Sequence, residues 1–171
     1  MRYKTLAQLQ RPHERAVCEI DHPGPAGTGV DLRGNTVGRV ELTNTGKTVV
    51  ARGSIAGQGV LTCSRCLRDF PWRFDVSFVE HCALRQIDDP AVYATDEDED
   101  DPIPIVDDEL VDLTELVRQM IALEVPFQPL CKPDCRGLCH TCGAVLDEEA
   151  CRCEGDAVDP RWAKLKGLLE E

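Results

Sequence analysis

The chain has 171 residues, which is enough for one ordinary domain with appendages and excludes two full-sized domains. Its net charge of −12 comes from one segment, because thirteen acidic residues and no Lys or Arg lie between Gln86 and Val117, which leaves −12 + 13 = +1 for the rest of the chain. No apolar run of about 18 residues predicts a membrane-spanning helix, and residues 1–14 lack the apolar stretch of a secretory signal, so we expect a cytoplasmic protein.

The first half of the chain predicts β-structure. Residues 37–42 and 47–51 read as two strands joined by an Asn-Thr-Gly turn. Gly57 and Gly59 then predict a break before the next strand. Residues 70–78 alternate strictly between aromatic or aliphatic and polar side chains, and this period of two is typical of a strand with one buried face and one face in water.

An acidic segment and a helix follow. Residues 86–111 combine acids with three prolines and predict an exposed loop, which we interpret as a solvated linker, with docking to a basic partner as the alternative. The helix is predicted over 112–125, with Asp112 as its cap and Glu115 at capping-box spacing. Its apolar residues fall on one face, which predicts core packing: Leu113, Leu116, Val117, Met120 and Ile121.

The end of the chain predicts a cysteine-rich module with a terminal helix over 159–169. In a reducing compartment, cysteines at close spacing are more often metal ligands than disulfides. A CxxC pair followed after eight residues by a CxC pair can surround one ion with four thiolates, as zinc prefers. We therefore predict one zinc site from Cys139, Cys142, Cys151 and Cys153. His140 lies between the first two, and we interpret it as a surface side chain.

A second four-thiolate site is less local. Cys63 and Cys66 form a CxxC just before the aromatic strand, and Cys131 and Cys135 precede the first site. If these four join, their zinc would clip the cysteine-rich module to the sheet. In the alternative, Cys131 and Cys135 belong to the local cluster and the first CxxC stands alone. We expect one or two ions with a structural role, because zinc stabilises small modules that have few apolar residues of their own.

These elements predict an α+β fold. We expect a small antiparallel sheet over about 29–85, curled toward a barrel, to pack on the predicted helix, with a zinc-ribbon-like module after it. The predicted division is a β-rich domain over 1–125, including the acidic loop and the helix, and a cysteine-rich module with its terminal helix over 126–171.

Basic side chains near the cysteines are candidate contacts for RNA phosphates. They are Arg65, Arg68, Arg136 and Lys164. The alternative is ordinary surface charge, because seven acids between Val125 and Leu169 nearly cancel six bases. A basic protein held by the acidic loop is therefore as credible a partner as RNA.

Enzymatic functions receive less support. The CxxC at Cys63 and Cys66 suggests a thiol oxidoreductase, with Arg65 lowering a thiolate pKa, but no βαβ pattern surrounds it. A zinc hydrolase or deaminase needs an open coordination position and a general base, and neither HExxH nor HxE is present. We therefore expect a protein that binds rather than catalyses, with a zinc-ribbon protein-interaction module as a further alternative.

Several separate motifs, in order, resemble the YceD family, named for accumulation of large ribosomal RNA subunits. They are CSRCL at 63–67, DL at 112–113, PLC at 129–131, DCRGLC at 134–139, CG at 142–143 and DPRWAKL at 159–165. The resemblance covers about residues 60–170. It implies a bacterial-type role in ribosome biogenesis, in which the protein supports the accumulation of large-subunit (23S) rRNA. The implied partners are that rRNA, a large-subunit ribosomal protein, or both, and no catalytic residues are implied.

Overall fold

The computed structural model describes residues 1–86, 103–107 and 109–153. The predicted terminal helix, Lys164 and most of the acidic loop lie outside the described residues. The elements in chain order are β1 (Arg2–Tyr3), the 3₁₀ turn η1 (Leu6–Leu9), β2 (Arg15–Pro23), β3 (Asp31–Asn44), β4 (Val49–Thr62), β5 (Asp69–Gln86), β6 (Ile103–Asp107), β7 (Leu110–Asp112) and α1 (Thr114–Glu124). No helix in the described part of the chain has the length and apolar character needed to cross a membrane.

The strands form one sheet in the order β1-β7-β6-β5-β4-β3-β2. A sheet with a helix agrees with the predicted α+β class, but the prediction of an antiparallel sheet is only partly right, because β5 and β6 are parallel. Parallel neighbours need a long connection, and 16 residues separate Gln86 from Ile103. The sheet also starts earlier than predicted, because β2 pairs along its whole length with β3.

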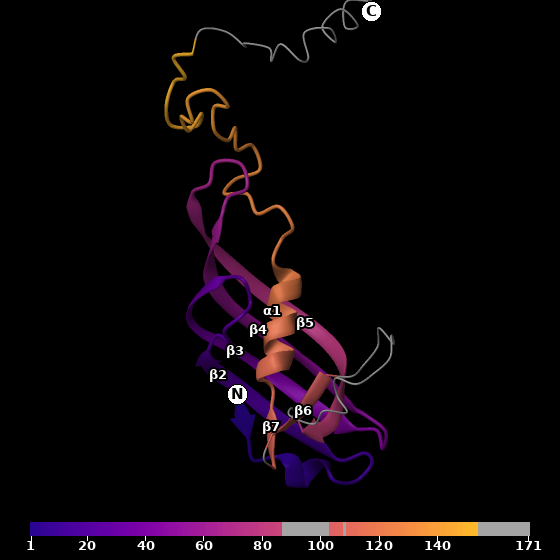
Figure 1. The fold of residues 1–171 in the computed structure, drawn as a ribbon. Helices are drawn as coiled ribbons and strands as arrows, with labels where there is room; N and C mark the ends of the chain where they lie inside the picture. The colour runs from indigo at the N-terminus through magenta and orange to yellow at the C-terminus, as the bar shows by residue number, and fades with distance from the viewer. Residues whose placement is uncertain (87–102, 108, 154–171) are drawn as a thin grey trace, which may run out of the picture.

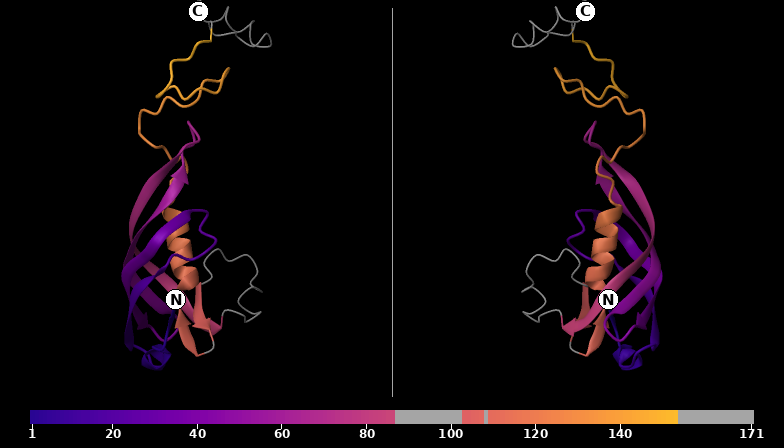
Figure 2. Two further views of the ribbon diagram at one scale, coloured as in Figure 1. Left: turned by 90° about the vertical axis from the view of Figure 1, so that its left-hand side faces the viewer. Right: turned by 90° about the vertical axis from the view of Figure 1, so that its right-hand side faces the viewer.

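The sheet curls until its two edges approach each other. The long strands β2 to β5 curve around α1, which lies on the concave side (Figures 1 and 2). The outermost strands then meet, because the Tyr3 hydroxyl of β1 donates to the Glu19 carbonyl of β2 at 3.0 Å. The Tyr3 ring also stands edge-on to His22, with 6.4 Å between the ring centres. The result is a nearly closed, barrel-like sheet.

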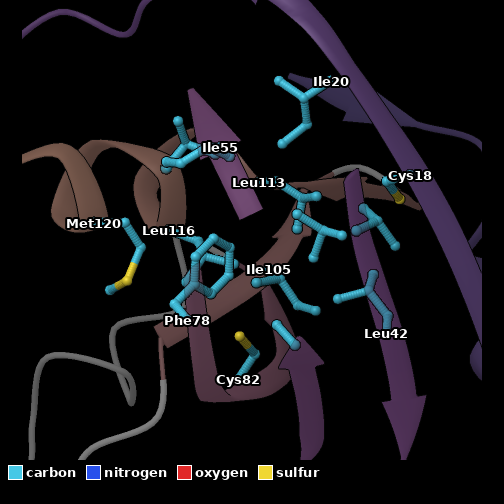
Figure 3. Packing of buried hydrophobic residues seen from close by; sticks show 14 of the residues in the cluster. Cys18, Ile20, Leu42, Ile55, Phe78, Cys82, Ile105, Leu113, Leu116 and Met120 are labelled. Carbon is cyan, nitrogen blue, oxygen red and sulfur yellow. The ribbon is translucent and has the colours of Figure 1, made fainter. Parts of the chain in front are cut away.

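The apolar stripe of α1 fills this sheet, as predicted. Leu113, Leu116, Val117 and Ile121 have no exposed surface, and Met120 has 5%. Figure 3 shows Leu116 and Met120 beside Phe78, with Cys82 and Ile105 next to them. Each such side chain contributes about 1.5–3 kcal/mol through the apolar surface that folding removes from water. The helix and sheet therefore hold each other in place.

The cap of α1 is Leu113, so the prediction of Asp112 as the cap is wrong by one position, but the Asp112 side chain still anchors the start of the helix. Its carboxylate accepts a hydrogen bond from the backbone N–H of Thr114, the first helical residue, at 2.8 Å. Burial opposes ionisation, but the hydrogen bonds from Thr114 outweigh it and lower the pKa of Asp112. Glu115 does not complete a capping box. It pairs instead with Arg118 and accepts a hydrogen bond from Gln119.

Strand β4 runs unbroken through Gly57 and Gly59, so the predicted break is wrong. The physical reason is the register with β5, which places small residues opposite large ones. The opposed pairs are Gly53 with Phe78, Gly57 with Phe74 and Gly59 with Trp72. A Cβ atom at Gly57 would lie 2.6 Å from the Phe74 ring. Gly57 therefore leaves room for the Phe74 ring inside the curved sheet, whereas a Cβ atom at Gly53 or Gly59 would first meet Val30 or atoms of β3.

We expect Gly57→Ala to destabilise the fold by roughly 1–3 kcal/mol, because the added methyl group overpacks the core. The buried Phe74 ring has little freedom to move, since it packs against Trp72 with 5.2 Å between ring centres. Urea unfolding should show a lower midpoint with an unchanged slope. Ser54→Ala, on the outer face of the same strand, is the control and should stay within about 0.5 kcal/mol. Equal stability of Gly57→Ala and the wild type would contradict this account.

Candidate metal centre

Four sulfur atoms meet at the tip of the hairpin formed by β4 and β5. Cys63 and Cys66 lie in its turn, which is closed by hydrogen bonds from Cys63 N to Arg68 O and from Leu67 N to Cys63 O. The chain after α1 brings Cys131 and Cys135 to the same point. The Sγ distances are 3.9 Å from Cys63 to Cys135 and 3.7 Å from Cys66 to Cys131. All four sulfurs lie within 4.8 Å of one another, and we call this set the inner cluster.

A second set of four sulfurs lies further along the chain. Cys139, Cys142, Cys151 and Cys153 also have all sulfurs within 4.8 Å of one another, and we call them the outer cluster. The turn between the first two is closed by the N–H of Gly143, which donates to the Cys139 carbonyl at 2.9 Å. Gly143 has a φ of +74°, a conformation that side chains disfavour. This glycine lets the CxxC pair present both sulfurs to one point.

Both clusters fit a metal ion with four sulfur ligands. Thiolates bound at about 2.3 Å in a tetrahedron stand roughly 3.8 Å apart. The closest sulfur pairs have separations from 3.3 Å, between Cys139 and Cys151, to 3.9 Å, between Cys63 and Cys135. All eight cysteines are free thiols rather than disulfides. Each cluster could therefore hold one metal ion, and the arrangement follows the predicted grouping into two sets.

The first cysteine of each CxxC is prepared for ionisation. Burial opposes ionisation of Cys63, but backbone N–H groups, led by that of Cys131, outweigh it and lower its pKa to about 6. Backbone N–H groups of Cys142 and Thr141 lower the pKa of Cys139 to about 6 as well. Burial instead raises the pKa of Cys135 to about 12. A bound cation would favour loss of the remaining thiol protons, because metal ligation needs thiolates.

The two clusters differ in exposure. Cys63, Cys66 and Cys135 of the inner cluster have at most 2% of their surface exposed, and Phe70 packs against them. In the outer cluster, Cys142 is exposed. The inner cluster joins residues more than 60 positions apart, whereas the outer cluster is local. A metal in the inner cluster would thus hold two parts of the fold together.

Three of the basic residues predicted to contact RNA lie where the β4–β5 turn meets the chain after α1, which we call the junction. Arg65 donates through Nη1 to the Cys135 carbonyl at 2.8 Å. Arg68 forms an ion pair with Glu148. Arg136 bonds to Asp147 at 3.1 Å and to the Leu146 carbonyl. The described arginines therefore have intramolecular partners, and their contact with RNA stays a prediction, as it does for Lys164.

Asp147 connects the two halves of the cysteine-rich module, and the sequence analysis did not identify it. Its carboxylate lies 3.0 Å from the Lys132 ammonium group and 3.1 Å from the Arg136 guanidinium group. The hydrogen bond from Lys132, and then those from Arg136, lower the pKa of Asp147 to about 2. Its two cationic partners lie 15 and 11 positions earlier in the chain, and no local sequence pattern marks such a pairing.

Comparison with known proteins gives one family. Residues 51–169 match the family described as "Large ribosomal RNA subunit accumulation protein YceD". An uncharacterized protein of Mycobacterium tuberculosis is 39% identical over 132 residues, which cover 77% of this chain and 59% of the relative. The protein YlbN of Bacillus subtilis is 34% identical over 122 residues, or 69% of this chain and 64% of the relative. No solved structure matches.

A plant relative has a more informative name. A chloroplastic protein of Zea mays, "Large ribosomal RNA subunit accumulation protein YCED homolog 1", is 38% identical over 64 residues. This match covers 37% of the present chain and 22% of the maize protein. The chain spans 59% of the length of the Mycobacterium tuberculosis relative, so the similarity concerns part of that protein.

We expect the purified protein to hold two metal ions per chain, one in each cluster. Cys66→Ser should remove the inner ion and Cys142→Ser the outer one, because each substitution removes one of four ligands. Elemental analysis of protein purified without chelator measures both the number and the kind of metal. Thr141→Ala, which changes no sulfur, should keep the full content. A metal-free wild-type protein with reduced thiols would refute both sites.

The difference in exposure predicts unequal metal release. A chromogenic chelator should withdraw the ion of the outer cluster first and that of the inner cluster more slowly, because solvent reaches Cys142 but not Cys63 or Cys135. The absorbance of the chelate should therefore rise in two phases. Cys142→Ser should abolish the fast phase and leave the slow one. Loss of the slow phase in this variant would show that the assignment is reversed.

Proposed function

The chain belongs to the YceD family, and on that premise we propose that it is a non-catalytic factor that supports accumulation of large-subunit (23S) ribosomal RNA. The observation that carries the proposal is the extent of the family match, which spans nearly all of β4 and the whole of β5, α1 and both cysteine clusters. The maize and Arabidopsis relatives are named for the accumulation of large ribosomal RNA subunits. The similarity therefore includes the whole candidate metal centre.

We propose zinc as the metal of both clusters, with a structural role. Four thiolates at tetrahedral spacing are a ligand set that zinc prefers, and such a shell has no open position for a substrate. Bound at the inner cluster, zinc would supply the cross-link between the β4–β5 turn and the chain after α1. This account explains why a segment with few buried apolar side chains has a defined arrangement.

Binding at this junction, to rRNA or to a large-subunit ribosomal protein, is the proposed mode of action. Arg68 and Arg136 would have to exchange a carboxylate for a phosphate, which reduces the net gain from such a contact. Arg65 bonds to a neutral carbonyl, so its charge is not compensated by that partner. The acidic residues between Gln86 and Val117 suit a basic ribosomal protein instead.

A thiol oxidoreductase is the weaker proposal. The lowered pKa of Cys63 would suit thiolate chemistry. However, Cys63 has no exposed surface, and two further sulfurs, from Cys131 and Cys135, complete its surroundings. A redox-active CxxC needs access for its substrate, which favours metal binding at this position.

Depletion of the protein in cells should lower 23S rRNA relative to 16S rRNA, and the wild-type gene should restore the ratio. Cys66→Ser should fail to restore it, because the junction loses its cross-link. Ser77→Ala, on the outer face of β5, is the matched control and should restore it fully. Quantification of both rRNAs and of ribosomal particles on gradients measures the effect. An unchanged rRNA ratio after depletion would rule out the proposed function.

A further inference from the structure

Phe127 is an aromatic side chain with 99% of its surface exposed. It lies in the linker between α1 and the inner cluster, in the sequence Val125-Pro126-Phe127-Gln128-Pro129. A phenylalanine gains about 1.5–3 kcal/mol from full burial, so packing among the described residues does not explain this position. Single exposed apolar residues are common, and the surroundings of Phe127 decide whether it has a role.

The linker that carries Phe127 is held in a fixed place. The N–H and the hydroxyl of Ser64 both donate to the Pro129 carbonyl, at 2.9 and 3.1 Å. Figure 1 shows the tip of the β4–β5 hairpin meeting the chain beyond α1 at this point. Pro126 and Pro129 further restrict the backbone on both sides of Phe127, because the proline ring fixes φ. The exposed ring is therefore presented on a constrained segment beside the hairpin turn.

Apart from their cysteines, the two segments that meet here carry positive charge only. Residues 63–68 and 125–133 contain three basic residues and no acidic one. Glu148 pairs with Arg68, and Asp147 pairs with Lys132. Among the described residues, no carboxylate pairs with Arg65, which follows Ser64 in the chain. One guanidinium group without a carboxylate partner and one exposed aromatic ring are thus carried by residues one and two positions away from the contact between Ser64 and Pro129.

We propose that Phe127 and Arg65 form a binding site for single-stranded RNA, in which one unpaired base stacks on the Phe127 ring and Arg65 contacts an adjacent phosphate. The proposal rests on the proposed function and names the partner of that junction. Aromatic rings with neighbouring basic groups bind single strands, because every base has a face that can stack. A duplex keeps its base faces covered, so the site favours unpaired RNA.

Stacking supplies most of the affinity in this proposal. Four thiolates around a dication leave a formal charge of −2 beneath the junction, which weakens its attraction for phosphate. Contact with one phosphate gives a log–log salt slope of about −0.7 for single strands. The dependence of binding on salt should therefore be weak, and its dependence on the ring should be strong.

The test is fluorescence anisotropy of a labelled oligouridylate of about 10 nucleotides, within the usual range of site sizes, with the metal-loaded full chain. Phe127→Ala should bind it roughly 5- to 150-fold more weakly, as expected for loss of one stacked base. Phe127→Trp should bind at least as well as the wild type. Phe127→Leu should be as weak as Phe127→Ala, because an aliphatic side chain has no ring face.

Leu123→Ala is the matched control, since Leu123 is also apolar and 77% exposed but lies on α1. It should bind the oligouridylate like the wild type. Wild-type binding by Phe127→Leu, or no binding by the wild-type protein, would overturn the site and point to an apolar protein partner. Because this assay uses no cells, a failed site with a normal depletion phenotype would leave the proposed function standing. Conversely, confirmed RNA binding at Phe127 with an unchanged rRNA ratio after depletion would keep the site and reject the proposed function.

Discussion

The convergence of four sulfur atoms from two distant segments is the constraint on which the arrangement beyond α1 depends. The turn after β4 contributes Cys63 and Cys66, and the chain after the helix contributes Cys131 and Cys135. The apolar residues around them, such as Phe70 and Val145, form only a small cluster. The polar links from Ser64 and Arg65 to the opposite backbone then align the two segments. The converging sulfurs and these polar links together give the junction a definite shape.

The main core differs from this junction, because it is held together mainly by burial of apolar surface. The stripe of α1 enters a sheet that curls until β1 approaches β2. Such curvature needs close approach between strands and space for large rings on the inner face. The glycines of β4 opposite the aromatic residues of β5 provide both. The long β4–β5 hairpin can therefore extend beyond the helix and carry the cysteine turn at its end.

Spacing and periodicity predicted what depends on neighbours in the chain. The helix with its buried stripe, the aromatic strand and the outer cluster follow from local patterns, whereas the meeting of the two cysteine pairs of the inner cluster does not. Tertiary pairing decided the rest. Gly57 and Gly59 read as a break because their aromatic partners lie on the next strand. No local pattern encodes the parallel pairing of β6 with β5 or the ion pairs of Asp147. The exposure of Phe127 likewise depends on its surroundings in the folded chain.

The order of residues in the inner cluster has a consequence for synthesis of the chain. Domains form from the N-terminal end as translation proceeds, and Cys66 is made 65 residues before its neighbour Cys131. The hairpin turn therefore emerges with two thiols that lack their partners, while α1 has yet to be made. The inner cluster can close only after Cys135 has left the ribosome. Capture of a metal ion by all four thiolates of this cluster would thus be a late step of biosynthesis, after β7 and α1 have been synthesised.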